Sequence, residues 1–356
     1  MAKGINLMVG TSPEGQGGIA TVIRGYINYG LFDKYNIRFI ATHHSDIESR
    51  LGMMLFYAKS LLTLIWLGCT NKLGWAHVHL ASRGSYKRKH LFIKIARKLG
   101  AKIIIHLHGG EFNTFYSEQS EQGKREIEHF FRDADCILAL SKQTATWLGK
   151  LCNRTEHIKV LYNAVPNFHG NTNSRNHKHV LFMGHIGDRK GIFDLVPAFA
   201  RTLEAHPEAR LRIGGVGEMD KLHKMIADLN IADNVDVLGW VVGEQKLAEL
   251  AGADVFCLPS NNEAMPMSVL EAMSATMAVV TTKVGGIPEI ITSGENGLLF
   301  DAGDQDALHA CLQQTFSNQE LKASLSNAAK QYFDTHLCED VIFGQLQNTY
   351  NSIGGR

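Results

Sequence analysis

Several features are missing from this sequence of 356 residues. Its six cysteines include no C-x-x-C pair, which argues against a disulfide framework and favours reduced, mostly buried thiols in a cytosolic protein. Low-complexity tracts and blocks of like charge are absent, so extensive disorder is not expected. The N-terminus "MAKGINLMVG" has no cleavage site, and we expect it to form a first strand instead of a signal peptide.

Motifs for common cofactors are missing as well. There is no H-E-x-x-H and no cysteine pair, and the D-x-D at residues 133–135 precedes a strand and is better interpreted as its cap. The 17 histidines are dispersed along the chain, so no metal is expected. The stretches "GTSPEGQGG" and "GHIGDRKG" lack the G-x-G-x-x-G spacing of dinucleotide-binding proteins. A nicotinamide oxidoreductase is therefore not expected, and no other cofactor is indicated.

Strand-like apolar segments alternate with helical patterns along the whole chain. With 45% hydrophobic residues the chain can bury a large core, and its length predicts two domains. The predicted strands lie within residues 5–9, 37–42, 76–81, 102–109, 136–141, 158–163, 179–184, 209–215, 234–240, 254–260 and 278–284. Such alternation predicts an α/β fold with parallel sheets, formed twice. We expect a first domain over 1–163, a linker rich in Asn, Gly, Ser and His over 164–179, and a second domain over 180–338.

The formal net charge of +1 conceals an asymmetry between the two halves. Residues 1–163 contain 22 Lys and Arg against 12 Asp and Glu, a net charge of +10, whereas the remainder contains 14 against 23, a net charge of −9. A basic half suits an anionic surface or an anionic substrate, and charge alone does not distinguish the two.

Two acids lie eight positions apart in "NNEAMPMSVLEAM", residues 261–273. Pro266 suits the start of a helix, so we expect Glu263 in the loop before that helix and Glu271 inside it. Both acids then border a helix N-terminus, where free amides and the macrodipole favour an anion. From spacing alone, one surface acid and one helix acid are the simpler interpretation, and a ligand-binding pair is the alternative.

Both halves open with a glycine-containing turn between a strand and a helix. Gly17 and Gly18 precede one predicted helix, and Gly184 and Gly191 flank the loop before another. Glycine lets the backbone approach a ligand at such a turn, where the helix N-terminus faces it. An ordinary tight turn of an α/β fold explains each one equally well.

The run from Ser260 to Phe300 resembles the signature of the retaining glycosyltransferases of family 4, which have the GT-B fold. Their E-x7-E pair is here Glu263 and Glu271, followed by a strand and a turn at Gly285-Gly286. "HLHGG", "LALS", "LYNAV" and "DRKG" fit the same family, so the resemblance covers most of the chain. It implies two Rossmann-like domains facing a cleft, with a nucleotide sugar bound mainly by the C-terminal domain and the acceptor mainly by the N-terminal one. A final helix over 339–356 is expected to cross back to the N-terminal domain.

The resemblance also assigns roles to individual residues. Glu271 would accept hydrogen bonds from the ribose hydroxyls, Glu263 from hydroxyls of the donor sugar, and Lys190 would bind the phosphates. The expected catalytic residues are His108, Glu263 and Lys190. The expected donor-binding residues are Gly17, Gly18, Gly184, His185, Arg189, Lys190, Ala264, Met265, Pro266, Met267 and Glu271. Without the resemblance, Lys190 would be interpreted as a solvated loop lysine.

One position departs from the family pattern. Relatives have an arginine just after the glycine of the "DRKG" strand, but here Gly184 is followed by His185. Histidine is a weaker and titratable cation, which puts part of the phosphate clamp in question. Arg189 could compensate from the same loop, and we hypothesise that His185 contacts the diphosphate.

Two histidines occur in "HLHGG". His108 fits the family histidine that faces the reacting sugar, and His106 lies two residues earlier, so on a strand both side chains point to the same face. For His106 the preferred interpretation is a structural histidine with satisfied hydrogen bonds. No general base is obvious. The family tolerates this, since its retaining mechanism is usually drawn with the donor phosphate accepting the acceptor proton. Glu111 is a candidate acceptor contact.

A membrane interface is suggested by two segments. Residues 51–69 form an apolar run with one charge, Lys59; a buried or partly buried domain helix is preferred there over an interfacial helix or a membrane span. "RGSYKRKH" follows, and a solvated helix face is its simplest interpretation. Together with the basic half it could instead meet anionic lipid or a lipid-linked phosphate. The cations concerned are Arg83, Lys87, Arg88 and Lys89.

Together these features predict a retaining glycosyltransferase that moves a sugar from a nucleoside-diphosphate sugar to a hydroxyl of a saccharide or polyprenyl-diphosphate-linked acceptor. We expect it to be cytoplasmic and peripheral on the inner face of the cell membrane, in the synthesis of cell-surface polysaccharide, lipopolysaccharide or glycolipid. It would need no metal and no nucleic acid. The alternatives are a nucleotide-sugar epimerase or phosphorylase on the same fold, and a non-catalytic nucleotide-sugar-binding protein.

Overall fold

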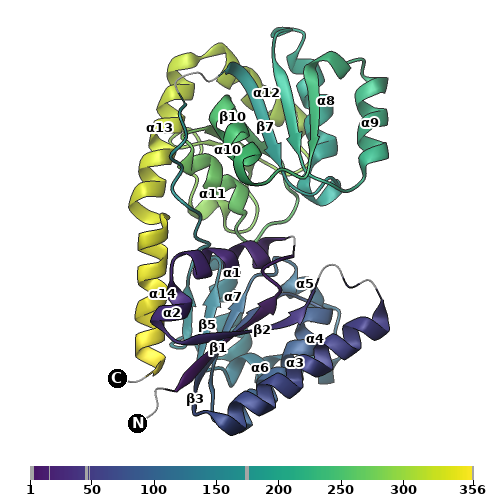
Figure 1. Cartoon of the computed structure of the whole chain (residues 1–356). Helices are drawn as coiled ribbons and strands as arrows, with labels where there is room; N and C mark the ends of the chain where they lie inside the picture. Colours follow the sequence, from purple (N-terminus) through teal and green to yellow (C-terminus); the bar gives the residue numbers. More distant parts are fainter. Residues whose placement is uncertain (1–3, 16, 45–46, 48, 173–175, 355–356) are drawn as a thin grey trace. The chain divides into compact units, whose positions relative to one another are not determined.

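The computed structural model describes residues 4–15, 17–44, 47, 49–172 and 176–354. The chain divides into two compact units, one of Met1–Asn163 with Ile342–Arg356 and the other of Ala164–Val341. The division falls after Asn163, where the net charge of the sequence also changes sign. Figure 1 shows that each unit has a central sheet flanked by helices, as the predicted α/β class requires.

The N-terminal unit contains six parallel strands in the order β2-β1-β3-β4-β5-β6. Its strands are β1 (Ile5–Thr11), β2 (Ile37–His43), β3 (Leu73–Leu80), β4 (Lys102–Leu107), β5 (Cys136–Ala139) and β6 (Ile158–Val160). Its helices are α1 (Gly18–Asn28), α2 (Leu31–Lys34), α3 (Arg50–Thr70), α4 (Gly84–Lys98), α5 (Phe112–Ser117), α6 (Glu121–Arg132) and α7 (Lys142–Cys152).

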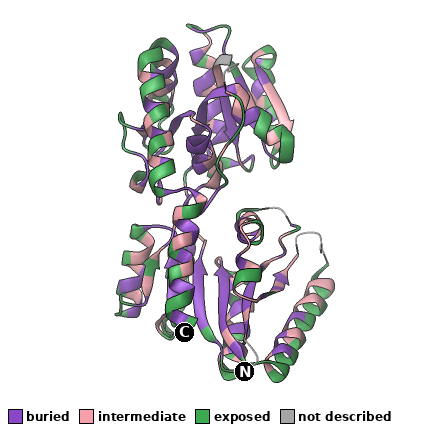
Figure 2. Cartoon of the chain, turned by 60° about the vertical axis from the view of Figure 1, so that its left-hand side comes forward, coloured by how far each residue is buried: buried purple, intermediate pink, exposed green. Residues whose placement is uncertain are grey.

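The sheet of the N-terminal unit is covered on both faces, which is why its central strands β3 and β4 are buried along almost their whole length (Figure 2). Side chains alternate between the two faces along a strand. Val78 of β3 belongs to the apolar cluster that includes residues of α3, α4, α6 and α7. Its neighbours His77 and His79 face the other way, toward Tyr26 of α1, and His77 also faces Tyr350. One face therefore packs on this apolar cluster, and the other contains a row of histidines.

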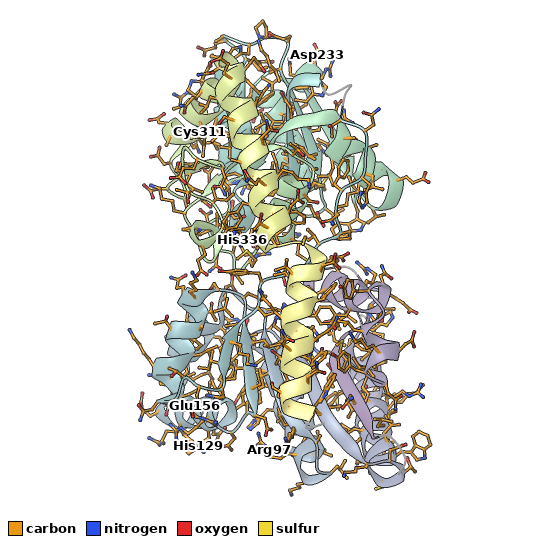
Figure 3. The ribbon with its side chains drawn as sticks, turned by 90° about the vertical axis from the view of Figure 1, so that its left-hand side faces the viewer. Arg97, His129, Glu156, Asp233, Cys311 and His336 are labelled. Atoms are coloured by element: carbon orange, nitrogen blue, oxygen red, sulfur yellow. The ribbon has the colours of Figure 1, made fainter. Side chains whose placement is uncertain are left out.

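The last helix, α14 (Glu339–Gly354), belongs to the N-terminal unit from Ile342 onward. Tyr350 stacks on Trp75 with ring centroids 4.2 Å apart, and Phe343 contacts the ring of Tyr29 at 4.4 Å. Figure 3 shows this helix lying lengthwise along the unit to which it belongs. The contacts are aromatic and buried, so the C-terminal segment contributes directly to the core of the N-terminal unit.

The C-terminal unit contains six parallel strands in the order β12-β11-β10-β7-β8-β9. Its strands are β7 (Asn176–Met183), β8 (Arg210–Gly214), β9 (Val235–Gly239), β10 (Ala253–Leu258), β11 (Ala278–Thr282) and β12 (Leu298–Phe300). Its helices are η1 (Asp188–Lys190), α8 (Ile192–Thr202), α9 (Met219–Asp228), η2 (Ala232–Asn234), α10 (Gly243–Gly252), α11 (Met267–Ser274), η3 (Ile287–Glu289), α12 (Gln305–Ser317) and α13 (Gln319–His336).

All eleven strands predicted from the sequence are present, and two details differ. The short strand β12 was not among them. The predicted linker over 164–179 is too long at its C-terminal end, because β7 already begins at Asn176. Asn176 pairs with Ala253 of β10 through the backbone, and this pairing does not depend on how polar the side chains are.

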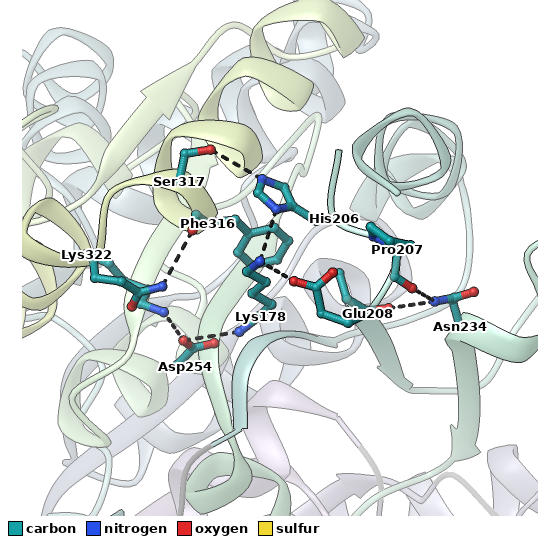
Figure 4. Close-up of polar contacts among 11 residues, drawn as sticks. Lys178, His206, Pro207, Glu208, Asn234, Asp254, Phe316, Ser317 and Lys322 are labelled. Atoms are coloured by element: carbon teal, nitrogen blue, oxygen red, sulfur yellow. Dashed lines mark hydrogen bonds and ion pairs between the residues drawn. The ribbon is translucent and has the colours of Figure 1, made fainter. Parts of the chain in front are cut away.

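A buried ion pair connects α13 to the start of β10 in the C-terminal unit (Figure 4). Lys322 donates to Asp254, and both side chains are 7% exposed. The backbone amide of Lys178 approaches the same carboxylate at 3.4 Å, and the ammonium group of Lys178 lies 3.1 Å from Nδ1 of His206. Because breaking a buried ion pair is costly, this group of contacts holds α13 to the sheet.

Helix α3 has an unusual surface for a domain helix. By length and composition it is the one helix among the described residues that could cross a membrane. Only Ser60, Leu64 and Leu67 are buried, so the helix is partly buried, as the sequence suggested, along a narrow stripe. The large apolar side chains exposed on it are Leu51, Met54, Leu55, Leu62, Ile65 and Trp66.

Candidate functional site

Each sheet has a switch point, beside its first strand, where the chain stops adding strands on one side of that strand and continues on the other side. In the C-terminal unit this point lies between β7 and β10, and in the N-terminal unit it lies between β1 and β3. Ligands of open α/β sheets bind outside the carboxyl ends of the strands at such points. The loops after β7 and β10 are those that contain Lys190 and Glu263.

The loops after β7 and β10 form one closely packed structure. The backbone amide of Asn261 donates to the carbonyl of Arg189 at 2.9 Å, and its side chain donates to the carbonyl of Asp188 at 2.7 Å. Gly191 has a φ of 69°, and a Cβ atom there would lie 1.9 Å from the carbonyl oxygen of Pro259. Only glycine allows this approach, so the turn before α8 and the loop before α11 fix each other.

Lys190 and Glu263 meet at this point as a shielded ion pair. Their side chains are 15% and 7% exposed. The hydroxyl of Ser260 donates to the same carboxylate oxygen of Glu263 at 2.8 Å. An ammonium group has three donors, so Lys190 keeps donors for a second anion while it holds Glu263. A pair in so little water interacts more strongly than a surface pair, so the two side chains hold each other in place.

The backbone on both sides of Glu263 is held by a second glycine. Gly285 has a φ of 58°, and a Cβ atom there would lie 1.8 Å from the carbonyl oxygen of Glu263. The next residue, Gly286, donates its amide to the carbonyl of Ala264 at 2.9 Å. The Gly-Gly turn noted in the sequence therefore supports the loop of the first acid.

Glu271 lies inside α11, and Glu263 lies in the loop before it, as the sequence predicted. The helix starts at Met267 after Pro266, whose side chain has no group that could cap the first amides. Lys246 of α10 donates to Glu271 at 2.6 Å, and the two side chains are 28% and 12% exposed. Each acid thus has a lysine partner. Sequence reasoning missed Lys246, because nothing in the spacing of 25 residues links α10 to α11.

The remaining candidates of the C-terminal unit border the same loops. His185 and Arg189 are exposed, and Gly184 is partly buried. A Cβ atom on Gly217 would lie 2.9 Å from the ring of His185, so the loop after β8 passes close to this histidine. Among the donor-loop residues, Met265 and Pro266 are buried, whereas Ala264 and Met267 are partly exposed.

In the N-terminal unit His108 follows β4, and its Nε2 lies 2.8 Å from Nδ1 of His79 on β3. Desolvation lowers the pKa of His108 to about 3, with a smaller effect of nearby Lys89. The ring is therefore neutral at physiological pH, and it can orient a ligand hydroxyl but not act as a fixed cation. His106 points to the same face as His108, as predicted, with ring centroids 4.1 Å apart.

Lys89 corrects the interpretation of the basic segment. It was grouped with solvated or membrane-facing cations, but it is only 1% exposed and lies on the inner face of α4. Its ammonium group donates to the hydroxyl of Ser85 at 2.8 Å. Burial lowers the pKa of Lys89 to about 7, and Arg88 adds to the shift. Successive residues of a helix are about 100° apart around its axis, so a run of adjacent cations need not share one surface.

The other N-terminal candidates lie at the surface. Gly17, with a φ of 115°, precedes the first residue of α1, Gly18, and both are exposed. Glu111 is exposed immediately before α5, and Arg83 and Lys87 are exposed at the start of α4. None of these positions contradicts the expected contacts, and none of them tests those contacts.

Four of the histidines are not dispersed in space, although they looked dispersed in the sequence. His77, His79, His106 and His108 form a row of ring contacts on one face of β3 and β4. The first three are 0–1% exposed. His106 is buried as expected, but its Nε2 has no hydrogen-bond partner among the described residues, so it is not fully satisfied.

Comparison with known proteins agrees with this architecture. Residues 166–332 match the family model for glycosyl transferases group 1. The solved structure of Anabaena Alr3699/HepE in complex with UDP-glucose superimposes with a TM-score of 0.77 at 19% identity, covering 98% of this chain and 100% of that one. The fold is that of the GT-B glycosyltransferases.

Curated relatives of this GT-B chain match it over part of their length. The lipopolysaccharide core biosynthesis glycosyltransferase LpsE of Rhizobium meliloti is 30% identical over 206 residues, covering 55% of this chain and 58% of LpsE. The exopolysaccharide phosphotransferase SCO2592 of Streptomyces coelicolor is 30% identical over 226 residues, covering 62% of this chain and 24% of that protein. The chain therefore spans less than two thirds of the length of both relatives.

Proposed function

We propose that this chain is a retaining glycosyltransferase of the family 4 type, which transfers a sugar from a nucleoside-diphosphate sugar to a hydroxyl of a saccharide acceptor. The observation that carries the proposal is the shielded Lys190–Glu263 pair at the switch point of the C-terminal sheet. Helix α11 begins just after Glu263 and contains Glu271. An activated sugar presents an anionic end and hydroxyls, and this arrangement offers partners for both.

The departing diphosphate gains negative charge as the bond to the sugar breaks. Lys190 and the uncapped first amides of α11 supply positive groups there, which is where electrostatic stabilisation matters most. Glu263 then accepts hydroxyls of the sugar, and Glu271, held by Lys246, accepts those of the ribose. We propose that these groups stabilise the negative charge of the departing diphosphate without a metal ion.

The acceptor is proposed to be a saccharide of cell-surface polysaccharide or lipopolysaccharide, linked to a polyprenyl diphosphate. This part rests on the names of relatives such as LpsE and on the basic N-terminal half. His108, as a neutral ring at the end of β4, would hydrogen-bond the reacting sugar, and Glu111 would contact the acceptor. Proton acceptance would fall to the donor phosphate.

Donor screening tests the proposal. UDP-, GDP- and ADP-sugars are compared for the rise they cause in the melting temperature Tm, and the best donor is used with saccharide acceptors to determine the anomeric configuration of the product by NMR. Glu263→Gln should abolish turnover, whereas the matched control Glu244→Gln, exposed on α10, should not. An inverted product would exclude the retaining mechanism. Conversion of the donor without an acceptor would favour an epimerase or phosphorylase, and tight donor binding without any turnover would favour a binding protein.

We further propose that the chain attaches to the anionic inner face of the cell membrane through α3 and α4. Leu55, Leu62 and Trp66 are 64%, 67% and 63% exposed on one side of α3. Helix α4 packs against α3. Its residues Lys87 and Lys94 are exposed, whereas Lys89 points to the opposite side of the helix and is buried. Apolar side chains beside cations are the usual composition of a surface that enters anionic lipid headgroups.

Vesicle flotation tests the membrane surface. The chain should float with phosphatidylglycerol vesicles and much less with phosphatidylcholine vesicles. Leu62→Gln with Trp66→Gln should lower the bound fraction at least tenfold, since each side chain loses about 1.5–3 kcal/mol of apolar burial. Leu229→Gln, an exposed leucine of the C-terminal unit, is the control. Equal binding to neutral vesicles would defeat the electrostatic version.

A further inference from the structure

The histidine row of the N-terminal unit brings together groups that are far apart in the sequence. β3 and β4 are neighbouring parallel strands, and His79 lies directly beside His106 in their register. His77 precedes His79 by two residues, so it points to the same face. One nitrogen from each of these three rings lies within 4.8 Å of the others.

The hydrogen bonds of the row leave nitrogen atoms unused. His77 Nδ1 lies 2.7 Å from the hydroxyl of Tyr350, and His79 Nδ1 lies 2.8 Å from Nε2 of His108. His77 Nε2 lies 3.2 Å from His106 Nδ1. Among the described residues, Nε2 of His79 and Nε2 of His106 are buried without a hydrogen-bond partner. Buried polar atoms in native proteins are nearly always satisfied, so the unused Nε2 of His79, which is free to coordinate an ion, needs an explanation.

We propose that His77, His79 and His106 bind one divalent transition-metal ion of the zinc class. Imidazole nitrogens coordinate Zn²⁺ at about 2.0–2.1 Å, which places two ligands of a tetrahedral ion about 3.3 Å apart. The separation of 3.2 Å between His77 Nε2 and His106 Nδ1 already matches this value. All three ligand atoms lie within 4.8 Å of one another, and the wider separations would shorten when the ion binds.

The surroundings supply the other requirements of such a site. Metal ligands must be neutral imidazoles, and the rings of His77, His79 and His106 are only 0–1% exposed, where burial disfavours the charged form. Ligand histidines usually donate their second N–H to an outer partner, as His77 can to Tyr350 and His79 to His108. The hydroxyl of Tyr26, 3.5 Å from His106 Nδ1, can provide a fourth ligand.

The ion would have a structural role, and its one link to the proposed sugar transfer would be the hydrogen bond between His79 and His108. It would join β3 to β4, and through Tyr350 it would stiffen the attachment of α14 to the same unit. The donor loops of the C-terminal unit contain none of its ligands, so loss of the metal and loss of donor binding can be measured separately.

The test uses the full chain without a histidine tag, stripped with a chelator and dialysed. Inductively coupled plasma mass spectrometry after Zn²⁺ addition should find one ion per chain. Free Zn²⁺ at a hundredfold excess over its Kd should raise Tm by about 5–10 °C. Co²⁺ in place of Zn²⁺ should give the visible absorption bands of a tetrahedral nitrogen site. His77→Gln and His106→Gln should lose all three signals, and the control His129→Gln, exposed on α6 (Figure 3), should keep them.

Two results would overturn the proposal. One is a wild-type chain that shows no stoichiometric ion, no shift of Tm and no tetrahedral Co²⁺ spectrum, because these measurements need no variant. The other is an ion whose stoichiometry is the same in wild type, His77→Gln and His106→Gln, which would place it elsewhere. If both glutamine variants fail to fold, Tyr350→Phe, which keeps all three ligands, should still bind one ion. Failure of Tyr350→Phe to bind would count equally against the site.

Discussion

The buried ammonium group of Lys89 should make the stability of this protein depend on pH in a predictable direction. Lysine in an unfolded chain has a pKa near 10.4, whereas burial lowers that of Lys89 to about 7. Between these two values the unfolded state binds a proton that the native state does not, so the free energy of unfolding rises with pH. Below about pH 7 Lys89 is protonated in both states, and the cost of the buried charge to the free energy of unfolding is greatest. Above about pH 10.5 it vanishes.

The size of the effect follows from the shift. Each pH unit in this window contributes about 1.36 kcal/mol, so the penalty should fall by about 2 kcal/mol between pH 7 and pH 9. Lys89→Met removes the charge and keeps the shape. At pH 7 the free energy of unfolding of the variant should rise by up to about 4 kcal/mol because the buried charge is absent. It should fall by about 1 kcal/mol because the hydrogen bond to Ser85 is lost. His79 and His108 remain neutral over this range because desolvation lowers their pKa values.

Urea unfolding at pH 6, 7, 8 and 9 measures this dependence, with tryptophan fluorescence as the probe in a Trp240→Phe background, so that the remaining tryptophans all belong to the N-terminal unit. The quantity of interest is the difference between Lys89→Met and wild type, because other titrating groups cancel in it. Lys87→Met, at an exposed neighbouring position, should give a difference that does not change with pH. The reasoning would be refuted if the Lys89→Met difference also stayed constant within about 0.5 kcal/mol.

Three further substitutions test the C-terminal unit. Lys190→Met should lower kcat about 10²–10³-fold, since it removes a positive group at the departing diphosphate, and unchanged kcat in steady-state assays would exclude that role. His185→Arg should keep or raise activity above neutral pH, and a large loss there would mean that His185 is not a phosphate contact. Lys322→Met should lower the free energy of unfolding, measured with urea, by about 3–5 kcal/mol, because it leaves the buried Asp254 carboxylate without its ammonium partner. Lys322→Met combined with Asp254→Asn should recover much of that loss; if it does not, the pair is not the cause.

Much of the fold was predictable because it depends on local patterns. The alternation of apolar strands with amphipathic helices repeats along the chain, and parallel strands need such crossover helices, so α/β follows. The start of α11 next to Pro266 was predictable for a similar reason, since proline restricts the backbone locally. The start of β7 was not, because pairing of Asn176 with Ala253 is a long-range backbone contact.

The candidate site was predictable only in part. Glu263, Glu271 and Lys190 could be named from motifs. The closeness of Lys190 to Glu263 and the pairing of Lys246 with Glu271 could not. These pairs join residues of different elements, and their distance in the sequence carries no information about their distance in space. The side of α4 on which Lys89 lies depended in the same way on where the sheet lies against that helix.

The amino-acid sequence by itself determined the class of fold, the order of the strands along the chain and the identity of the acids beside α11, because periodicity and backbone restriction act between near neighbours. The tertiary structure alone decided which side chains meet. It brought His77 and His79 beside His106, 27–29 residues away in the chain, because strand register and the two-residue alternation of side chains select the shared face. It also placed one lysine of a basic run inside the protein, where desolvation changes its chemistry.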